Sequence, residues 1–267
     1  MIRSLYSGVS GMKNHQIRMD VIGNNIANVN TSGFKSGRAN FQDTLYQLIR
    51  SASAGTASAL GGINPSQVGL GMSVSSITSN MGQGNMQSTG RTLDLAIQGN
   101  GWFAVSQDGG TTQYFTREGI FYIDDVGNLV NSNGYCLLDD NGEPINLGTD
   151  GVATLNISQA GVITGTDLAG ANLAPVIIGL AMFPNQEGLE RVGQNLFRES
   201  AASGVPVVGV PGAGGYGTIN SCYLEMSNVD LTEEFTNMII TQRGYQANAR
   251  TITTSDEMLE ELLNVKR

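Results

Sequence analysis

The glycine-rich run at residues 99–104 is the first place where residue types and spacing suggest a chemical site. Its sequence, GNGWFA, fits the loose G-x-G-x-x-G/A pattern of dinucleotide-binding turns. That pattern holds a pyrophosphate only where a helix begins at the glycines, because the helix N-terminus supplies the N–H groups. The next residues, VSQDG, indicate a strand that runs into a turn. We therefore expect no nucleotide cofactor here.

Two other motifs fail the same kind of test. S-x-x-K occurs at Ser10–Lys13 and Ser32–Lys35, but the chain has neither the S-D-N nor the K-T-G triplet that accompanies this motif in serine acyl-enzymes. The acidic run DDNGE at 139–143 resembles a calcium loop, yet its glycine is at position four rather than six and no glutamate closes it. We interpret the two S-x-x-K runs as parts of the N-terminal helix and its exit, and the DDNGE run as a hairpin turn.

The remaining reactive side chains are few and scattered. His15 is the single histidine, and its place on the polar side of a predicted helix indicates a solvent-facing residue rather than a general base. Cys136 and Cys222 are too few for a zinc site or a disulfide framework. The sequence therefore predicts no catalytic residue, no cofactor and no metal, and a protein that is not an enzyme.

Charge and hydropathy narrow the range of partners. The formal net charge is −9, with 14 Lys and Arg against 23 Asp and Glu, which disfavours binding to a phosphate backbone. The longest apolar run, residues 176–183, is far shorter than the ~20 residues that a membrane-spanning helix needs. Charges also interrupt the N-terminus, so we expect no cleaved signal. We predict no nucleic-acid partner, no direct membrane insertion, and either a cytosolic protein or one exported by another route.

Composition changes sharply along the chain. Residues 51–90 contain no charged side chain, and residues 200–224 are likewise neutral and rich in glycine. Such stretches bury too little apolar surface to offset their ordering entropy, so they are typical of flexible linkers. Two linkers of this kind would separate a middle segment from both ends of the chain.

Both ends show the spacing of long amphipathic helices. Apolar residues recur at alternating steps of three and four over about 35 residues at the C-terminus and over the first 26 residues. Asn228 or Asp230 is expected to cap the C-terminal helix. The stripe of either helix could face its own domain, but we expect the two stripes to pair with each other and with neighbouring subunits. The predicted seam consists of Leu5, Val9, Met12, Met19, Ile26, Leu231, Phe235, Met238, Tyr245, Ile252, Leu259 and Leu263.

The middle segment, from about 91 to 198, has the period of β-strands. Short β-prone runs at 93–97, 102–105, 113–116, 120–123 and 135–138 are separated by turn dipeptides at 108–109, 133–134, 141–142 and 150–151. Asp-Gly and Asn-Gly pairs accept the positive φ of tight hairpins. Regular spacing of this kind is typical of an antiparallel sandwich or barrel.

The predicted fold class is mixed α and β. Long N- and C-terminal helices pair as a coiled coil, and extended Gly/Ser-rich segments link them to an all-β domain that is an antiparallel sandwich or barrel-like. The expected domains are a helical inner-tube domain at 1–30 and 229–267, an extended connector at 31–67, and a β-rich outer domain at 68–228 that includes the return segment 200–224.

Several runs in chain order resemble one protein family. They are MIRSLYSGVSGM at 1–12, DVIGNNIANVNTSGFK at 20–35, STGRTLDLAI at 88–97, GWF at 101–103, FTREG at 115–119, EMSNVDL at 225–231 and QRGYQAN at 242–248. These motifs are similar to those of bacterial flagellar rod and hook proteins. The resemblance spans both ends and the middle of the chain.

The resemblance implies a structural polymer. Within the family, the run at 89–97, VGLG at 68–71 and the ending LNVKR look most like hook proteins in the short form of Gram-positive-type bacteria. The expected function is a subunit of the flagellar hook, a curved homopolymer that acts as a universal joint and transmits torque from rod to filament. The alternatives are a distal rod protein of the basal body and, in another class, a secreted binding or adhesin module.

Partners and location also follow from the resemblance alone. Implied partners are further copies of the chain, rod, hook–filament junction and hook-cap proteins, and the type III export apparatus. The implied location is the extracellular part of the flagellum, reached without a cleaved signal peptide.

Overall fold

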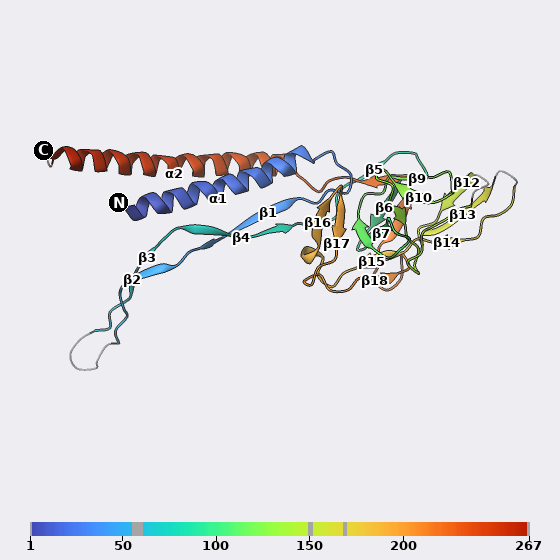
Figure 1. The fold of residues 1–267 in the computed structure, drawn as a ribbon, viewed down its shortest axis with the longest axis horizontal. Coiled ribbons are helices and arrows are strands. Elements are labelled where there is room, and N and C mark those ends of the chain that lie inside the picture. The colour runs from blue at the N-terminus through green and yellow to red at the C-terminus, as the bar shows by residue number, and fades with distance from the viewer. Residues whose placement is uncertain (1, 55–60, 149–151, 168–169, 266–267) are drawn as a thin grey trace. The chain divides into compact units, whose positions relative to one another are not determined.

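The computed structural model describes residues 2–54, 61–148, 152–167 and 170–265. The chain forms two compact units. Unit 1 comprises Met1–Ala27, Gly37–Thr78 and Asp230–Arg267, and unit 2 comprises Asn28–Ser36 and Ser79–Val229. Two long helices accompany a large antiparallel β region, so the predicted mixed α and β class is confirmed (Figure 1).

The described residues of unit 1 form both helices and four strands. Helix α1 (Ile2–Ala27) runs beside helix α2 (Leu231–Val265), as Figure 1 shows. Strand β1 (Gly37–Asp43), which also packs on α1, pairs with β4 (Met72–Ser79), and β2 (Tyr46–Arg50) pairs antiparallel with β3 (Ser66–Gly69).

These strands change the interpretation of the neutral segment. The sequence predicts a flexible linker at 51–90, but its described residues include β3, β4 and a strand of unit 2. The backbone N–H and C=O groups of these strands form hydrogen bonds in two-stranded ladders. Amino-acid composition alone does not predict this pairing. Residues 55–60 lie outside the described part. The predicted connector, 31–67, also does not coincide with one unit, because 37–78 groups with the helices.

Helix α2 begins at a side-chain cap. The Asp230 carboxylate accepts hydrogen bonds from the backbone N–H groups of Thr232 at 2.8 Å and Glu233 at 3.4 Å, which satisfies donors that lack partners within the helix. Glu233 and Glu234 in the first turn complement the helix dipole. Of the two predicted caps, Asp230 is therefore correct. Asn228 instead binds the backbone of unit 2, as described below.

Unit 2 is built from short strands and one 3-10 turn, Gln186–Gly188. The strands are β5 (Met86–Ser88), β6 (Leu95–Gln98), β7 (Trp102–Ser106), β8 (Gln113–Thr116), β9 (Phe121–Ile123), β10 (Leu129–Asn131), β11 (Cys136–Leu137), β12 (Val152–Ile157), β13 (Val162–Asp167), β14 (Val176–Ile177), β15 (Leu180–Met182), β16 (Glu190–Gly193), β17 (Leu196–Arg198), β18 (Val207–Gly209), β19 (Thr218–Ser221) and β20 (Tyr223–Glu225). All five β-prone runs of the sequence fall on or overlap these strands.

The largest sheet has the order β16-β17-β8-β7-β11-β10-β9, and β15 joins β7 to β18. Because successive side chains of a strand point to opposite faces, β7 supplies two hydrophobic clusters. Phe103 and Val105 belong to one cluster, and Trp102 and Ala104 to the other. The core of unit 2 therefore lies on both faces of its central strand.

The predicted tight turns occur where the sequence places them. Gly109, Gly134 and Gly142 have φ values of 64°, 82° and 84°, which side chains with a Cβ rarely adopt. The dipeptide at 150–151 lies outside the described residues. The glycines at 99 and 101 connect β6 directly to β7, so no helix follows them and the pattern at 99–104 is a turn.

Candidate functional site

The two helices pack antiparallel. In four contacting pairs the two residue numbers add up to 259, so near these contacts residue i of α1 faces about residue 259 − i of α2. The pairs are Ser4 with Ser255, Gly11 with Asn248, His15 with Gly244 and Asn25 with Glu234.

Most residues of these contacts are small or polar, whereas the sequence predicts an apolar seam. The predicted seam residue Ile252 does take part, because its Cγ1 atom would lie 3.2 Å from a Cβ on Gly8. Several predicted seam positions are one residue later than a contact position: Leu5 follows Ser4, and Tyr245 follows Gly244. One residue corresponds to about 100° around a helix, which moves the apolar stripe to the side of the contact. Most of these contacts within one chain therefore lie beside the predicted stripe rather than on it.

The twelve predicted residues are partly or largely exposed in the single chain. The residues Leu5, Met12, Met19, Ile26, Met238, Ile252 and Leu259 are half-buried, and Val9, Leu231, Phe235, Tyr245 and Leu263 are exposed. Their role in a polymer stays a prediction. The sequence signal for these contacts was the recurrence of small or polar residues at the same three–four spacing.

Glycines allow the helices to approach closely. A Cβ on Gly11 would lie 2.6 Å from Asn248 Nδ2, and a Cβ on Gly244 would lie 2.8 Å from His15 Cε1. Real Cβ atoms do not come so close to a neighbour, so larger residues at these positions would displace the Asn248 or His15 side chain from the space between the helices.

Asn25 fixes three elements of unit 1. Its buried side-chain amide donates to the Glu234 carboxylate and to the Gly37 carbonyl, each at 2.8 Å, and its oxygen accepts from the Gly37 N–H at 2.8 Å. Desolvation raises the pKa of Glu234, although the hydrogen bond from Asn25 opposes this shift. Further along α1, the Asn14 amide donates to the Met72 carbonyl of β4 at 2.6 Å. Helix α1 is therefore held on both α2 and the strands.

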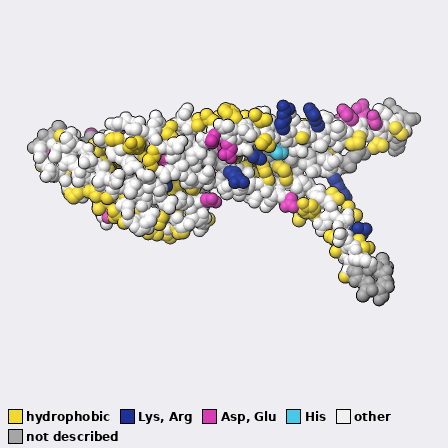
Figure 2. Space-filling view, turned by 180° about the vertical axis from the view of Figure 1, so that it is seen from behind, with side chains coloured by type: hydrophobic (Ala, Val, Ile, Leu, Met, Phe, Trp, Pro, Cys, Tyr) yellow, Lys and Arg dark blue, Asp and Glu magenta, His cyan; other side chains and the backbone are white. Residues whose placement is uncertain are grey.

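Unit 1 also exposes apolar side chains at regular positions. On α2, Leu231, Phe235 and Ile239 follow at intervals of four, and Phe235 is 50% exposed. On the β2–β3 ladder, Leu48 and Ile49 are more than half exposed. Figure 2 shows hydrophobic side chains on the surface of both regions. Contiguous apolar surface of this kind is typical of protein contacts.

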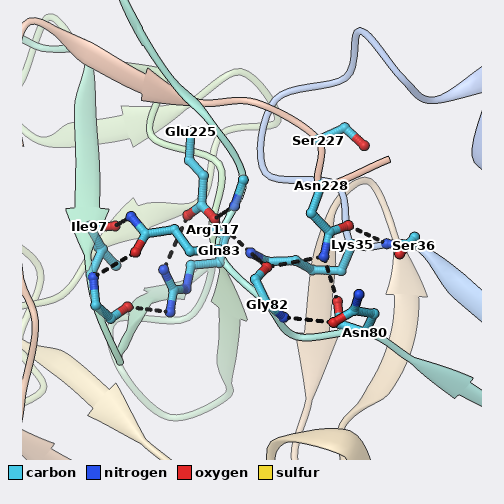
Figure 3. A network of polar contacts seen from close by, with 12 residues as sticks. Lys35, Ser36, Asn80, Gly82, Gln83, Ile97, Arg117, Glu225, Ser227 and Asn228 are labelled. Atoms are coloured by element: carbon cyan, nitrogen blue, oxygen red, sulfur yellow. Dashed lines mark hydrogen bonds and ion pairs between the residues drawn. The ribbon is translucent and has the colours of Figure 1, made fainter. Parts of the chain in front are cut away.

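Unit 2 contains a buried ion network, drawn in Figure 3. The Glu225 carboxylate accepts from Lys35 Nζ at 2.6 Å and from the Arg117 guanidinium at 3.1 Å. No more than 3% of any of these three side chains is exposed. Lys35 also donates to the Gly82 carbonyl at 2.9 Å, and Arg117 to the Gly99 carbonyl at 2.9 Å.

The network joins the points where the chain enters and leaves unit 2. Asn228 Oδ1 accepts from the Ser36 N–H at 2.8 Å, and its amide donates to the carbonyls of Asn80 and Gly82 (Figure 3). The Gly33 N–H donates to the Glu225 carbonyl at 2.8 Å. Lys35 lies in one of the S-x-x-K motifs, but its partner is 190 residues away, and no local pattern predicts such a pair.

Two cations share one carboxylate in this network. Desolvation lowers the pKa of Lys35, and the nearby Arg117 adds to this effect while Glu225 opposes it. Desolvation also lowers the pKa of Arg117, again against the attraction of Glu225. Buried charges are tolerated only when they are paired and hydrogen-bonded, so the negative charge of Glu225 is essential to both cations.

Within the described residues, no group of three or more His, Cys, Asp or Glu side chains is placed to hold a metal ion. Cys136 and Cys222 are both half-buried free thiols. None of the described helices is long and apolar enough to cross a membrane.

His15 is placed differently from the prediction. It lies in the helix seam against Gly244 and 6.2 Å from the Phe41 ring, rather than facing solvent. Its Nδ1 atom is buried and has no hydrogen-bond partner among the residues described. Burial lowers the pKa of His15, and Arg18 adds to this effect. The antiparallel partner helix, which sequence periodicity does not place, explains the difference.

Three protein families match parts of the chain. Residues 5–35 match the family "Flagella basal body rod protein", residues 96–165 match "Flagellar hook protein FlgE/F/G D1 domain", and residues 220–265 match "Flagellar basal body rod FlgEFG protein C-terminal". The matches follow the order of α1, the β region of unit 2, and β19 to α2.

Individual proteins are similar over the whole chain. The flagellar basal-body rod protein FlgG of Bacillus subtilis (strain 168) is 50% identical over 268 residues and 100% of both chains. FlgG of Caulobacter vibrioides is 41% identical over 263 residues, 97% of each chain. The flagellar hook protein FlgE of Borreliella burgdorferi is 32% identical over an alignment of 444 residues that covers 100% of both chains.

Proposed function

We propose that this chain, which belongs to the FlgE/F/G family of flagellar rod and hook proteins, is a structural subunit of the basal-body rod. The family is one of structural proteins of the flagellum. The observation that carries the rod assignment is the full-length similarity to proteins named FlgG, with 50% identity to the one from Bacillus subtilis.

The comparison of lengths favours the rod over the hook, which the sequence motifs had suggested. The FlgG relatives align over 262 to 272 residues with this chain of 267. The FlgE relative needs an alignment of 444 residues, so much of that protein has no counterpart here. The motifs at both ends are common to rod and hook proteins, and they could not separate the two. The adhesin alternative has no observation in its favour.

The exposed apolar surfaces support a homopolymer. A helix pair whose seam is polar leaves its apolar side chains for other contacts, and Leu231, Phe235 and Ile239 form a stripe suited to a second copy of α2. Contacts between unlike surfaces that do not close into a ring generate an open helical assembly. The proposed partners are further copies of the chain, neighbouring rod and hook proteins, and the type III export apparatus. The proposed location is the flagellum outside the cytoplasm.

Complementation tests the rod assignment. We expect this chain to restore motility and assembled basal bodies to Bacillus subtilis that lacks its FlgG relative, and to leave a strain that lacks its hook protein non-motile. Electron microscopy of the isolated basal bodies would check that the rods are straight. Restoration of the hook-deficient strain alone would contradict the proposal.

A matched pair of variants tests the polymer contact. Phe235→Asp places a charge on the exposed apolar stripe, so it should prevent complementation while the purified chain keeps its helical and β content. Thr236→Asp, at the next exposed position of the same helix, should complement normally. Normal complementation by both variants would show that the stripe makes no contact in the polymer.

A further inference from the structure

The residues at 28–36, here called the strap, are a separate piece of unit 2. The rest of the unit begins only at Ser79, because 37–78 belongs to unit 1. Polar contacts hold the strap on both sides: besides the bonds of Gly33 and Ser36, the Ser36 carbonyl accepts from the Asn80 N–H at 2.8 Å. The buried Phe34 ring lies 5.2 Å from the Arg191 guanidinium carbon.

Docking of the strap brings a cation into the interior. Lys35 is 1% exposed, and an ammonium group has three donors and no acceptor. A carbonyl such as that of Gly82 satisfies a donor but does not balance the charge. The balancing carboxylate belongs to Glu225, which β20 places there through its pairing with β5. The Gly84 N–H also donates to this carboxylate, at 3.0 Å.

We propose that Glu225 is a latch for the strap: the strap docks only when β20 has placed the Glu225 carboxylate between Lys35 and Arg117. The entry of the chain into unit 2 is thereby fixed to its exit, since Glu225 lies six residues before α2 begins. The latch acts within unit 2 and does not depend on the rod assignment.

The number of buried charges that each variant leaves unpaired predicts how strongly it should release the strap. Lys35→Met leaves one cation and one carboxylate, which is a neutral buried pair. Glu225→Gln keeps the shape of the side chain but leaves two buried cations without a counter-charge. The latch therefore requires E225Q to release the strap much more than K35M does, and K35M to relieve part of the defect of E225Q in the double variant.

Hydrogen–deuterium exchange of the full-length chain measures the release directly. In E225Q we expect the amides of Gly33 and Ser36 to exchange about tenfold faster or more, because both hydrogen bonds belong to the docked strap. Peptides from β7 should keep the exchange rate of the unaltered protein. K35M should show a smaller increase at the strap, and the double variant should lie between the two.

Three outcomes would overturn the latch. They are an unchanged strap in E225Q, an equal acceleration of strap and β7, and an effect of K35M as large as that of E225Q. If E225Q does not fold, Glu225→Asp takes its place, since it keeps the charge but shortens its reach; an unchanged strap in E225D would then refute the proposal. Glu190→Gln is the matched control, because the Glu190–Arg198 ion pair is exposed on both sides and should leave the strap unaffected.

Discussion

Single residues in the helix seam decide how the helices meet. His15 and Arg18 of α1 and Asn248 of α2 are not residues that usually occupy a coiled-coil core, yet all contact the partner helix. Each has a definite partner: the Arg18 guanidinium, for example, donates to the Asn237 side-chain oxygen at 3.3 Å. A seam of this composition depends on fit and on polar contacts more than on apolar burial, so it should respond to changes of one charge or one methyl group.

The stability of the helix pair should depend on pH through the protonation of His15. Its pKa in the folded chain is below the ordinary value of 6.5, so below about pH 6.5 the unfolded chain binds a proton that the folded one does not. Acid therefore favours unfolding, while no such effect exists well above pH 6.5. The groups that face the ring are Gly244, Phe41 and Arg18, of which only Arg18 is charged.

Thermal melts followed by helical circular dichroism check this prediction. The melting midpoint should fall between pH 7.5 and pH 5.5, and His15→Gln should flatten the fall. An equally steep fall in the variant would assign the pH dependence to another group.

At the scale of elements, the periodicity of the sequence predicted the helices but not the register in which they pair. The three–four spacing of α1 and α2 was visible, and the Asp-Gly and Asn-Gly pairs at 108–109, 133–134 and 141–142 placed turns of unit 2 correctly. Hydrophobicity did not indicate the close contacts within the chain, where Gly8, Gly11 and Gly244 permit a closer approach than leucine would. The ion network was beyond prediction for another reason: Lys35, Arg117 and Glu225 meet only through tertiary structure.

Two glycines of α1 provide a matched test of close packing. Gly11 faces Asn248, whereas a Cβ on Gly23 would meet nothing within 4 Å. Leucine is the better helix former by about 1 kcal/mol, so Gly23→Leu should stabilise the helix by up to this amount. Gly11→Leu should destabilise it despite the same gain in propensity, because the side chain has no room. Urea unfolding followed by circular dichroism measures both, and a stabilised Gly11→Leu would mean that the helices do not approach closely.

The whole molecule carries a charge that opposes its own assembly. Each subunit has a formal net charge of −9, so copies that come together repel one another unless salt screens them. If the contacts are mainly apolar, polymer formation by the purified chain should increase between about 10 mM and about 500 mM salt, where the Debye length falls from about 30 Å to less than 8 Å. Sedimentation of the polymer measures this dependence. A decrease with salt would mean that ion pairs between subunits dominate.

The register of the helices leaves one end of the pair uneven. Helix α1 begins at Ile2, which the register places beside Glu257, but α2 continues to Val265. The last eight described residues of α2, about 12 Å of helix, therefore extend beyond Ile2, the first described residue of α1. They display Met258, Leu262 and Leu263, each about half exposed or more. This overhang makes the two ends of the helix pair different. In a row of subunits joined through it, every subunit would therefore point the same way.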